Sequence, residues 1–364
     1  MTRRESLRRA LTRRAALRYF GAVAGAALAA CTQATTTAST APPSIVAPAA
    51  TAPPTVAATA APATPSPTLT PLTTPVPYDA AVGPLYDAHS HVEQIGAAAQ
   101  WDLMKKAGLT RWHVIGPFSP FSSSAQALSA LAGFRRANSA AVSLALSSPL
   151  TDVVMQSFTA PVTEETVTYM QERLATGSYD AVKLSLRHRP SDADPPSGVG
   201  QPANSPVPLR IYDLAAQRGV PVTLHFEHEY SDELDDALTR APKMQLIWAH
   251  AGDAQPDKLR ALMNKHTNLY ADISSRNAIY KRYHPFTEQS LALPDNKTIK
   301  PEWRQIFEDL PDRFLFGLDL GTEQERTKTI DEQVRYYRAI FGQLRPATAE
   351  KIAVLNAMRL FRKS

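Results

Sequence analysis

Eight short apolar runs alternate with longer amphipathic stretches from residue 84 onward, and this alternation most narrows the folds open to the chain. The runs have the length and composition of buried strands, whereas apolar residues in the stretches between them recur at helical spacing. Strands that alternate with helices predict a parallel α/β protein, and eight units favour a closed (β/α)₈ TIM barrel. The predicted strands are 84–88, 111–115, 141–146, 180–185, 221–225, 245–249, 268–273 and 313–318. The predicted helices are 96–107, 123–137, 163–175, 207–218, 231–240, 256–265, 301–309, 325–343 and 347–361.

An open, doubly wound sheet is the structural alternative to the barrel. No glycine-rich phosphate loop follows the first run, which counts against a dinucleotide-binding fold. About 286 residues remain after residue 78, a usual length for one barrel.

The first 78 residues have a different composition. Residues 32–78 are mainly Ala, Thr, Pro and Ser and carry no charge. Such a stretch cannot bury enough apolar surface to offset its chain entropy, so we expect a disordered tether. The predicted organisation is a leader at 1–31, a linker at 32–78 and one folded domain at 79–364.

The net charge of +5 belongs to the leader. Residues 1–31 hold seven Arg and one Glu, so the rest of the chain is close to neutral. The rest of the chain lacks the excess of basic residues that would predict a nucleic-acid partner. The expected partner is a small-molecule substrate, and the oligomeric state is left open.

The leader has the layout of an export signal. An Arg-rich region precedes the apolar run 19–28, which is short for a membrane span. Leu28-Ala-Ala-Cys31 resembles the lipobox of bacterial lipoproteins, and residues 12–18 resemble a twin-arginine motif, except that Ala16 stands where an aromatic residue is usual. Cys31 is the only cysteine, so no intramolecular disulfide can form. We expect lipidation at Cys31 and a membrane-anchored protein outside the cytoplasm; the alternative is a signal peptide with a chance cysteine.

Side chains of metal-ligand type fall at the ends of the predicted strands. Asp87-Ala-His89-Ser-His91 closes the first run, and later runs contain or end at Lys183, His225, His250 and Asp319. The carboxyl ends of barrel strands share one rim, where active sites lie. Two imidazoles on one strand and a distant carboxylate suit zinc or a similar divalent ion.

The side-chain alternation along the strands supports this interpretation. It predicts that Lys183, His225, Asp272 and Asp319 lie on the face opposite the apolar, helix-facing rows. In the first strand it places Asp87 and His89 on one face and Tyr86 and Ala88 on the helix-facing side.

These segments together resemble the amidohydrolase superfamily, in particular its amidohydrolase-related branch of hydrolases, decarboxylases and lactonases. The similarity runs through Asp87–His91, Val182-Lys183-Leu184, Val222–His225, Ile247–Gly252, Asn268–Ser274 and Phe316–Asp319, and into the final segment 351–361. Leu318 departs from the branch, in which Ser commonly precedes the last Asp.

The resemblance implies a role for each matched residue. His89, His91 and His225 would bind a metal ion, and Asp319 would move a proton of the attacking water. His250 would bind a second ion or contact the substrate and developing negative charge. Lys183 would either be a carboxylated bridge between two ions or an unmodified lysine. Asp87 would brace its strand or a ligand, and Asp272 would be a structural hydrogen-bonding residue.

Substrate contacts are expected from the loops that open onto the rim. Arg187 and Arg189 follow the fourth strand, and Arg276 follows the seventh. A guanidinium there can bind a substrate carboxylate, although a solvated loop arginine is the alternative. The remaining histidines are expected at the surface or in loops: His113, His188, His228, His266 and His284.

The expected function is therefore metal-dependent hydrolysis of an amide, ester or lactone. A non-oxidative decarboxylase with the same metal site is one alternative, and an exported binding protein without catalysis is another. The fold alone does not select among them.

Overall fold

The computed structural model describes residues 77–92, 96–116, 125–147, 162–186, 201–281, 290–321 and 328–361 of the 364-residue chain. All of them lie in the second of the two units into which the chain divides, Pro71–Ser364. The predicted leader, Cys31 and all but the last two residues of the predicted tether lie outside this description. Within the described ranges, no helix combines the length and the apolarity needed to cross a membrane.

Eight parallel strands form one sheet in chain order, and each strand pairs with the next along the chain. Each of the eight predicted runs overlaps one of them, although β1 ends three residues and β3 one residue later than predicted, and the hydrogen-bonded ladders are shorter than predicted at the sixth and eighth. The strands are β1 Tyr86–His91, β2 Arg111–Ile115, β3 Val142–Ser147, β4 Ala181–Ser185, β5 Val222–His225, β6 Leu246–Trp248, β7 Leu269–Asp272 and β8 Phe314–Leu315.

Backbone hydrogen bonds bring β1 against the segment that begins with β8. The amide of Ala88 donates to the carbonyl of Phe316 at 2.9 Å, that of Asp319 to His89 at 2.5 Å, and that of His91 to Leu320 at 3.1 Å. These bonds join β1 to the segment directly after β8, and the predicted (β/α)₈ barrel is confirmed.

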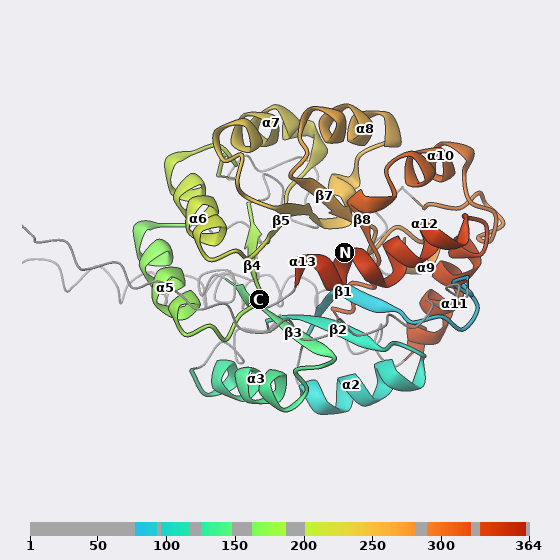
Figure 1. Ribbon diagram of the computed structural model, residues 1–364, viewed down its shortest axis with the longest axis horizontal. Coiled ribbons are helices and arrows are strands. Elements are labelled where there is room, and N and C mark those ends of the chain that lie inside the picture. Colours follow the sequence, from blue (N-terminus) through green and yellow to red (C-terminus); the bar gives the residue numbers. More distant parts are fainter. Residues whose placement is uncertain are drawn as a thin grey trace, which may run out of the picture. The chain divides into compact units, whose positions relative to one another are not determined.

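Helices surround the strands in a ring, as Figure 1 shows. Several begin with a proline in the first turn, where no intrahelical N–H is lost, at Pro206, Pro256 and Pro301. The helices are α2 Ala97–Lys106, α3 Ala125–Ala137, α5 Glu164–Ala175, α6 Pro206–Gln217, α7 Ser231–Arg240, α8 Pro256–Lys265, α9 Ala278–Lys281, α10 Pro301–Asp309 and α11 Ile330–Phe341.

The alternation of side chains divides the core into two apolar clusters. Val182 and Leu184 of β4 and Val222 and Leu224 of β5 join the buried residues of the surrounding helices, as predicted. The other cluster fills the barrel interior and contains one or two side chains from most of the strands, for example Ala181 of β4.

The first strand differs from the prediction. Tyr86 and Ala88 belong to the interior cluster, whereas Leu85 packs with the helices. The pairing of β1 with β2 shifts register between Asp87 and Ser90. Such a bulge adds a residue to one strand and re-aims the side chains that follow, so His89 and His91 also reach the interior. The predicted face of Tyr86 and Ala88 was therefore wrong.

The C-terminal segment crosses the barrel at the amino ends of the strands (Figure 1). It consists of α12 Pro346–Glu350, a π-helical turn Lys351–Leu355 and α13 Asn356–Leu360, where the sequence predicted one continuous helix. Leu360 and Phe361 belong to the interior cluster with Tyr86 and Leu315, so this segment closes the base of the barrel.

A hydrogen-bonded group lies beside Phe361, and we call His113, Ser143 and Tyr86 the base cluster. Nδ1 of His113 lies 2.6 Å from Oγ of Ser143, which lies 2.8 Å from the Tyr86 hydroxyl. The His113 ring stacks on Phe361 with centroids 3.8 Å apart. His113 is fully buried, so its predicted surface or loop position was wrong. His266 lies in the loop between α8 and β7, as predicted, but it is buried, with Nε2 2.5 Å from a carboxylate oxygen of Asp235.

Candidate metal and catalytic site

Three imidazoles meet one carboxylate just beyond the carboxyl ends of the strands. Nε2 of His89 and Nε2 of His91 lie 3.7 and 3.6 Å from Oδ1 of Asp319, and Nε2 of His250 lies 3.7 Å from its Oδ2. Asp319 follows β8 with a φ of 57°, a conformation that most side chains avoid. Three of the predicted site residues therefore converge on Asp319.

His89 is the most deeply enclosed of these residues. Its side chain is 1% exposed, and its buried Nε2 has no hydrogen-bond partner among the described residues. Burial holds the pKa of His89 well below its usual range, and the positive charge of Lys183 is the next largest cause. Both effects favour the neutral ring. Gly317 leaves room for it, because a Cβ there would come within 3.1 Å of the His89 Cβ.

His250 lies in a left-handed turn that the sequence did not reveal. His250, Ala251, Gly252 and Asp253 all have φ between 52° and 61°. Gly252 is required here, since a Cβ on it would come within 2.0 Å of the Trp248 ring. Non-glycine residues in this region store strain, a feature common at functional sites.

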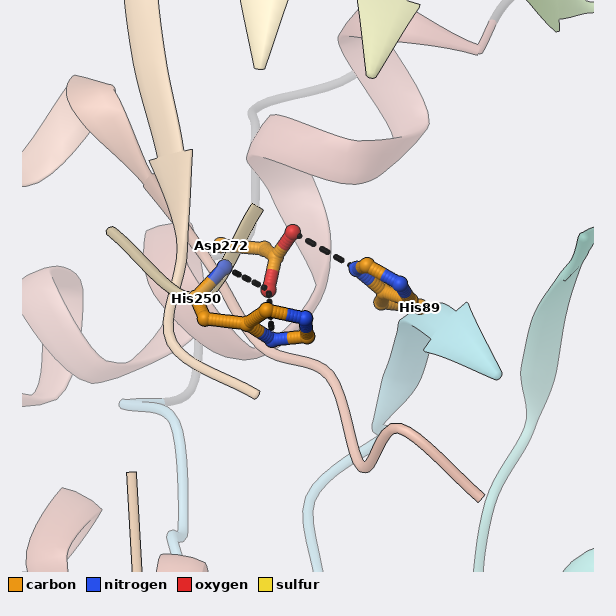
Figure 2. Close-up of side chains that lie close together, drawn as sticks. All are labelled: His89, His250 and Asp272. Atoms are coloured by element: carbon orange, nitrogen blue, oxygen red, sulfur yellow. Dashed lines mark hydrogen bonds and ion pairs between the residues drawn. The ribbon is translucent and has the colours of Figure 1, made fainter. Parts of the chain in front are cut away.

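Asp272 lies between His89 and His250, as Figure 2 shows. Its Oδ2 is 2.9 Å from Nδ1 of His89, and its Oδ1 accepts a hydrogen bond from the His250 amide at 3.1 Å. Ser274 connects the same carboxylate to Nδ1 of His250, which lies 2.8 Å from the Ser274 Oγ. The predicted hydrogen-bonding role of Asp272 thus has identified partners.

His225 and Lys183 complete the group of predicted residues. The His225 ring at the end of β5 meets the His250 ring edge-on, with centroids 4.7 Å apart. Lys183 is buried in β4, paired in register with Thr223 of β5. Its charge contributes to lowering the pKa of both His89 and His113.

The donor set fits a divalent ion. Ligand atoms about 2.1 Å from one tetrahedral ion are separated by about 3.4 Å, close to the 3.6 and 3.7 Å between Asp319 Oδ1 and the two imidazole nitrogens. The donor atoms of His89, His91 and Asp319 all lie within 4.8 Å of one another. The 2.9 Å between Asp272 and His89 is instead a hydrogen-bond distance.

Asp87 and Ser275 support the site from either side. Oδ1 of Asp87 accepts hydrogen bonds from the amides of His89 and Leu318, both at 3.0 Å, and so ties β1 to the segment after β8. Oγ of Ser275 donates to Oδ2 of Asp319 at 2.6 Å. Sequence analysis missed Ser275; its position directly after the Asp272-Ile-Ser274 segment was the available signal.

The arginines predicted to bind substrate lie elsewhere or outside the description. Arg276 is 1% exposed, and its guanidinium donates to the carbonyls of His250 and Ala254 at 2.8 and 2.9 Å while it stacks over Trp303. These contacts hold the turn that carries His250, instead of presenting the guanidinium at the open rim as predicted. Arg187 and Arg189 fall outside the described residues, as do His188 and His284.

A family model matches most of the chain. The model of the family described as Amidohydrolase matches residues 86–363. No protein of curated function matches the chain significantly.

Three solved structures are similar to this chain. An uncharacterized TIM-barrel protein from Bordetella bronchiseptica has a TM-score of 0.50 and 14% identity over 73% of this chain and 82% of its own. A probable 2-pyrone-4,6-dicarboxylic acid hydrolase from Acinetobacter baumannii, with citric acid bound, has a TM-score of 0.51 and 16% identity. The similarity covers 76% of this chain and 98% of the hydrolase. A 5-carboxyvanillate decarboxylase from Novosphingobium aromaticivorans, complexed with manganese, has a TM-score of 0.46 and 12% identity. The similarity covers 74% of this chain and 80% of the decarboxylase.

At 14% and 16% identity the first two structures show similarity of fold alone. The family match spans most of the chain, including every residue of the site. The chain belongs to the amidohydrolase family.

Proposed function

We propose that this chain is a metal-dependent hydrolase that cleaves an amide, ester or lactone-type bond. The observation that supports this most directly is the convergence of three imidazole Nε2 atoms on the Asp319 carboxylate, at 3.6 to 3.7 Å. The family includes enzymes of this chemistry, and the residues present suit an ion of the zinc type.

The residues divide into ion-binding and proton-handling groups. His89, His91 and His225 would hold one divalent ion, with Asp319 beside it; when bound, such an ion lowers the pKa of water and polarises a carbonyl. Asp319 accepts the proton from the attacking water. Ser275 donates to Oδ2 of Asp319 and holds the carboxylate in place.

His250 and Lys183 decide the number of ions in this proposal. The buried Lys183 amine binds a second ion together with His250 only if it is carboxylated; otherwise one ion is present and Lys183 contributes a positive charge beneath the site. A cation in that place attracts a substrate carboxylate, so the alternative reaction is non-oxidative decarboxylation.

The experiment is metal analysis of the purified chain followed by a substrate panel. We expect about one equivalent of zinc or a similar ion, and a second with a carboxylated Lys183. The panel contains amides, esters, aromatic carboxylates and lactones, with 2-pyrone-4,6-dicarboxylate among them because a probable hydrolase of that compound has this fold. Release of a carboxylic acid supports hydrolysis, whereas release of CO₂ indicates decarboxylation. Full activity without metal would contradict the proposal, and no activity on any compound would favour a binding protein.

We also propose that Cys31 carries a lipid anchor on the outer side of the cytoplasmic membrane. The support is the sequence Leu28-Ala-Ala-Cys31 before an uncharged stretch of 47 residues. Stable anchoring needs two acyl chains, which a bacterial lipoprotein provides. Cys31→Ser should therefore move the protein from the membrane fraction to the soluble exported fraction without loss of activity. Sedimentation of this variant with membranes would contradict the proposed anchor.

A further inference from the structure

We propose that Asp272 is a positioning residue that sets the tautomers of two active-site histidines at once, His89 directly and His250 through Ser274. The inference rests on the metal-dependent function proposed above. It assigns to one buried carboxylate the direction in which both imidazoles present a lone pair (Figure 2).

Asp272 fixes the position of the hydrogen on His89. Asp272 is fully buried, and its Oδ2 lies 2.9 Å from Nδ1 of His89. An ionised carboxylate only accepts hydrogen bonds, so Nδ1 carries the hydrogen. In the neutral ring the lone pair is then on Nε2, the atom that is buried without a hydrogen-bond partner among the described residues and lies 3.7 Å from Asp319.

The position of the hydrogen on His250 follows from the single hydrogen of the Ser274 hydroxyl. The Ser274 hydroxyl donates a hydrogen bond to Oδ1 of Asp272, and this bond uses its only hydrogen. The Ser274 oxygen then faces Nδ1 of His250 at 2.8 Å as an acceptor. Nδ1 of His250 therefore also carries a hydrogen, and its Nε2 lone pair faces Oδ2 of Asp319 at 3.7 Å.

This tautomer restricts what His250 can do. A neutral imidazole that presents a lone pair at Nε2 can bind an ion or accept a proton. It cannot donate a hydrogen bond to developing negative charge from that atom. The Asp272–Ser274 connection therefore excludes hydrogen-bond donation from Nε2 of His250 and leaves ion binding or proton acceptance.

The carboxylate also holds the backbone that carries His250. Oδ1 of Asp272 accepts hydrogen bonds from the amides of His250 and Ser274, both at 3.1 Å. His250 has a φ of 54°, a conformation that needs support from its surroundings. Tautomer and ring position thus depend on the same oxygen.

The competing role for Asp272 is direct ligation. Its carboxylate, His89 and His250 offer donor atoms within 4.8 Å of one another, as ligands of one ion would. The 2.9 Å contact with His89 Nδ1 is short for two ligands of one ion and normal for a hydrogen bond. Outer carboxylates that orient metal-bound histidines are common, and their loss typically costs 10- to 100-fold in metal affinity.

The test compares Asp272→Asn with Ser274→Ala in the full chain, by ¹⁵N NMR of labelled histidine and by chelator competition for zinc. The NMR spectrum of the metal-free wild type should show hydrogen on Nδ1 of both His89 and His250. Asp272→Asn places an amide beside His89 and should move its hydrogen to Nε2, with zinc affinity reduced about 10- to 100-fold.

Ser274→Ala should change the His250 signals, leave those of His89, and keep zinc affinity at the His89 site within about threefold, since the direct bond remains. Tyr270→Phe, two residues earlier on the same strand, is the matched control and should change neither readout. If Asp272→Asn fails to fold, the wild-type tautomers and Ser274→Ala still decide the question.

Three outcomes would overturn the inference. One is hydrogen on Nε2 of His89 in the wild type, and another is Asp272→Asn with unchanged tautomers and affinity. The third is loss of one bound ion from Asp272→Asn with the His89 tautomer intact, which would make Asp272 a ligand. A wild type that binds no zinc but shows the expected tautomers would refute the proposed metal function and support the positioning role, so the two failures are distinguishable.

Discussion

Two buried polar groups occupy opposite ends of the barrel, and each contains a histidine held by its Nδ1. In the base cluster, Ser143 bonds to Nδ1 of His113, whose buried Nε2 has no hydrogen-bond partner among the described residues. At the rim, Asp272 bonds to Nδ1 of His89. The buried Nε2 of His89 likewise has no hydrogen-bond partner among the described residues. A buried, oriented imidazole is therefore not sufficient to identify a site in this molecule.

The difference lies in what surrounds each Nε2. His89 faces a carboxylate and lies beside two further imidazoles, with ring centroids 5.5 Å away for His91 and 4.7 Å for His250. His113 is covered by the Phe361 ring in nearly parallel stacking. At the rim, the side chains around Nε2 can bind an ion. At the base, the Phe361 ring fills the space beside His113. We interpret the first as functional and the second as structural, and each of the following experiments tests that division.

The largest expected effect is the loss of stability on removal of the Phe361 ring. Phe361→Ala empties the space between His113 and the interior apolar residues, and truncation of a buried aromatic typically lowers the free energy of unfolding by about 3–5 kcal/mol. Chemical denaturation would measure the loss, and chelator competition on the folded variant should show unchanged zinc affinity. A variant that is stable but binds zinc poorly would mean that the two ends of the barrel are coupled.

Asp319→Asn should have the next largest effect, and on turnover instead of stability. The amide keeps the shape and the Ser275 contact but cannot accept a proton, so kcat should fall at least ~10²-fold, equivalent to about 2.7 kcal/mol. Metal should be partly retained. Ser143→Ala in the base cluster is the control and should keep wild-type kcat. Near-normal turnover of Asp319→Asn would move the proton acceptor to another group.

The sequence was sufficient for the parts of this fold that depend on local periodicity. Each predicted run overlaps one strand, and the apolar rows of β4 and β5 face the helices as predicted, because regular strands keep their two-residue alternation. The convergence of His89, His91, His250 and Asp319 was also predictable, since all barrel strands end at one rim.

The errors share a different cause, which is dependence on distant residues. The alternation in β1 fails at the bulge between Asp87 and Ser90, where the chain adjusts to the segment after β8. His113 is buried because Phe361, far along the chain, covers it. Arg276 turns inward because the left-handed turn at His250 exposes carbonyls to it. No local pattern encodes these partners.

The smallest expected effect is a difference in acid sensitivity between the two groups. Burial, and next the charge of Lys183, lowers the pKa of His113 to about 3, while Asp272 acts in the opposite direction. The unfolded chain binds a proton at this residue below its ordinary pKa of about 6.5, and the folded chain does not. Stability from the neutral ring is therefore complete above pH 6.5 and is lost as the pH falls toward 3.

His113→Gln should flatten this dependence. One proton taken up only on unfolding corresponds to about 1.4 kcal/mol per pH unit, and the variant should lack that slope between about pH 6 and 4.5. Urea denaturation of both proteins at several pH values, with chelator present, measures the difference, and contributions from all other groups are common to both. Turnover at neutral pH should be unchanged, because the base cluster lies at the closed end of the barrel. Parallel stability curves for the two proteins would show that His113 is protonated in the folded state, and the structural interpretation of the base cluster would then have to include a buried charge.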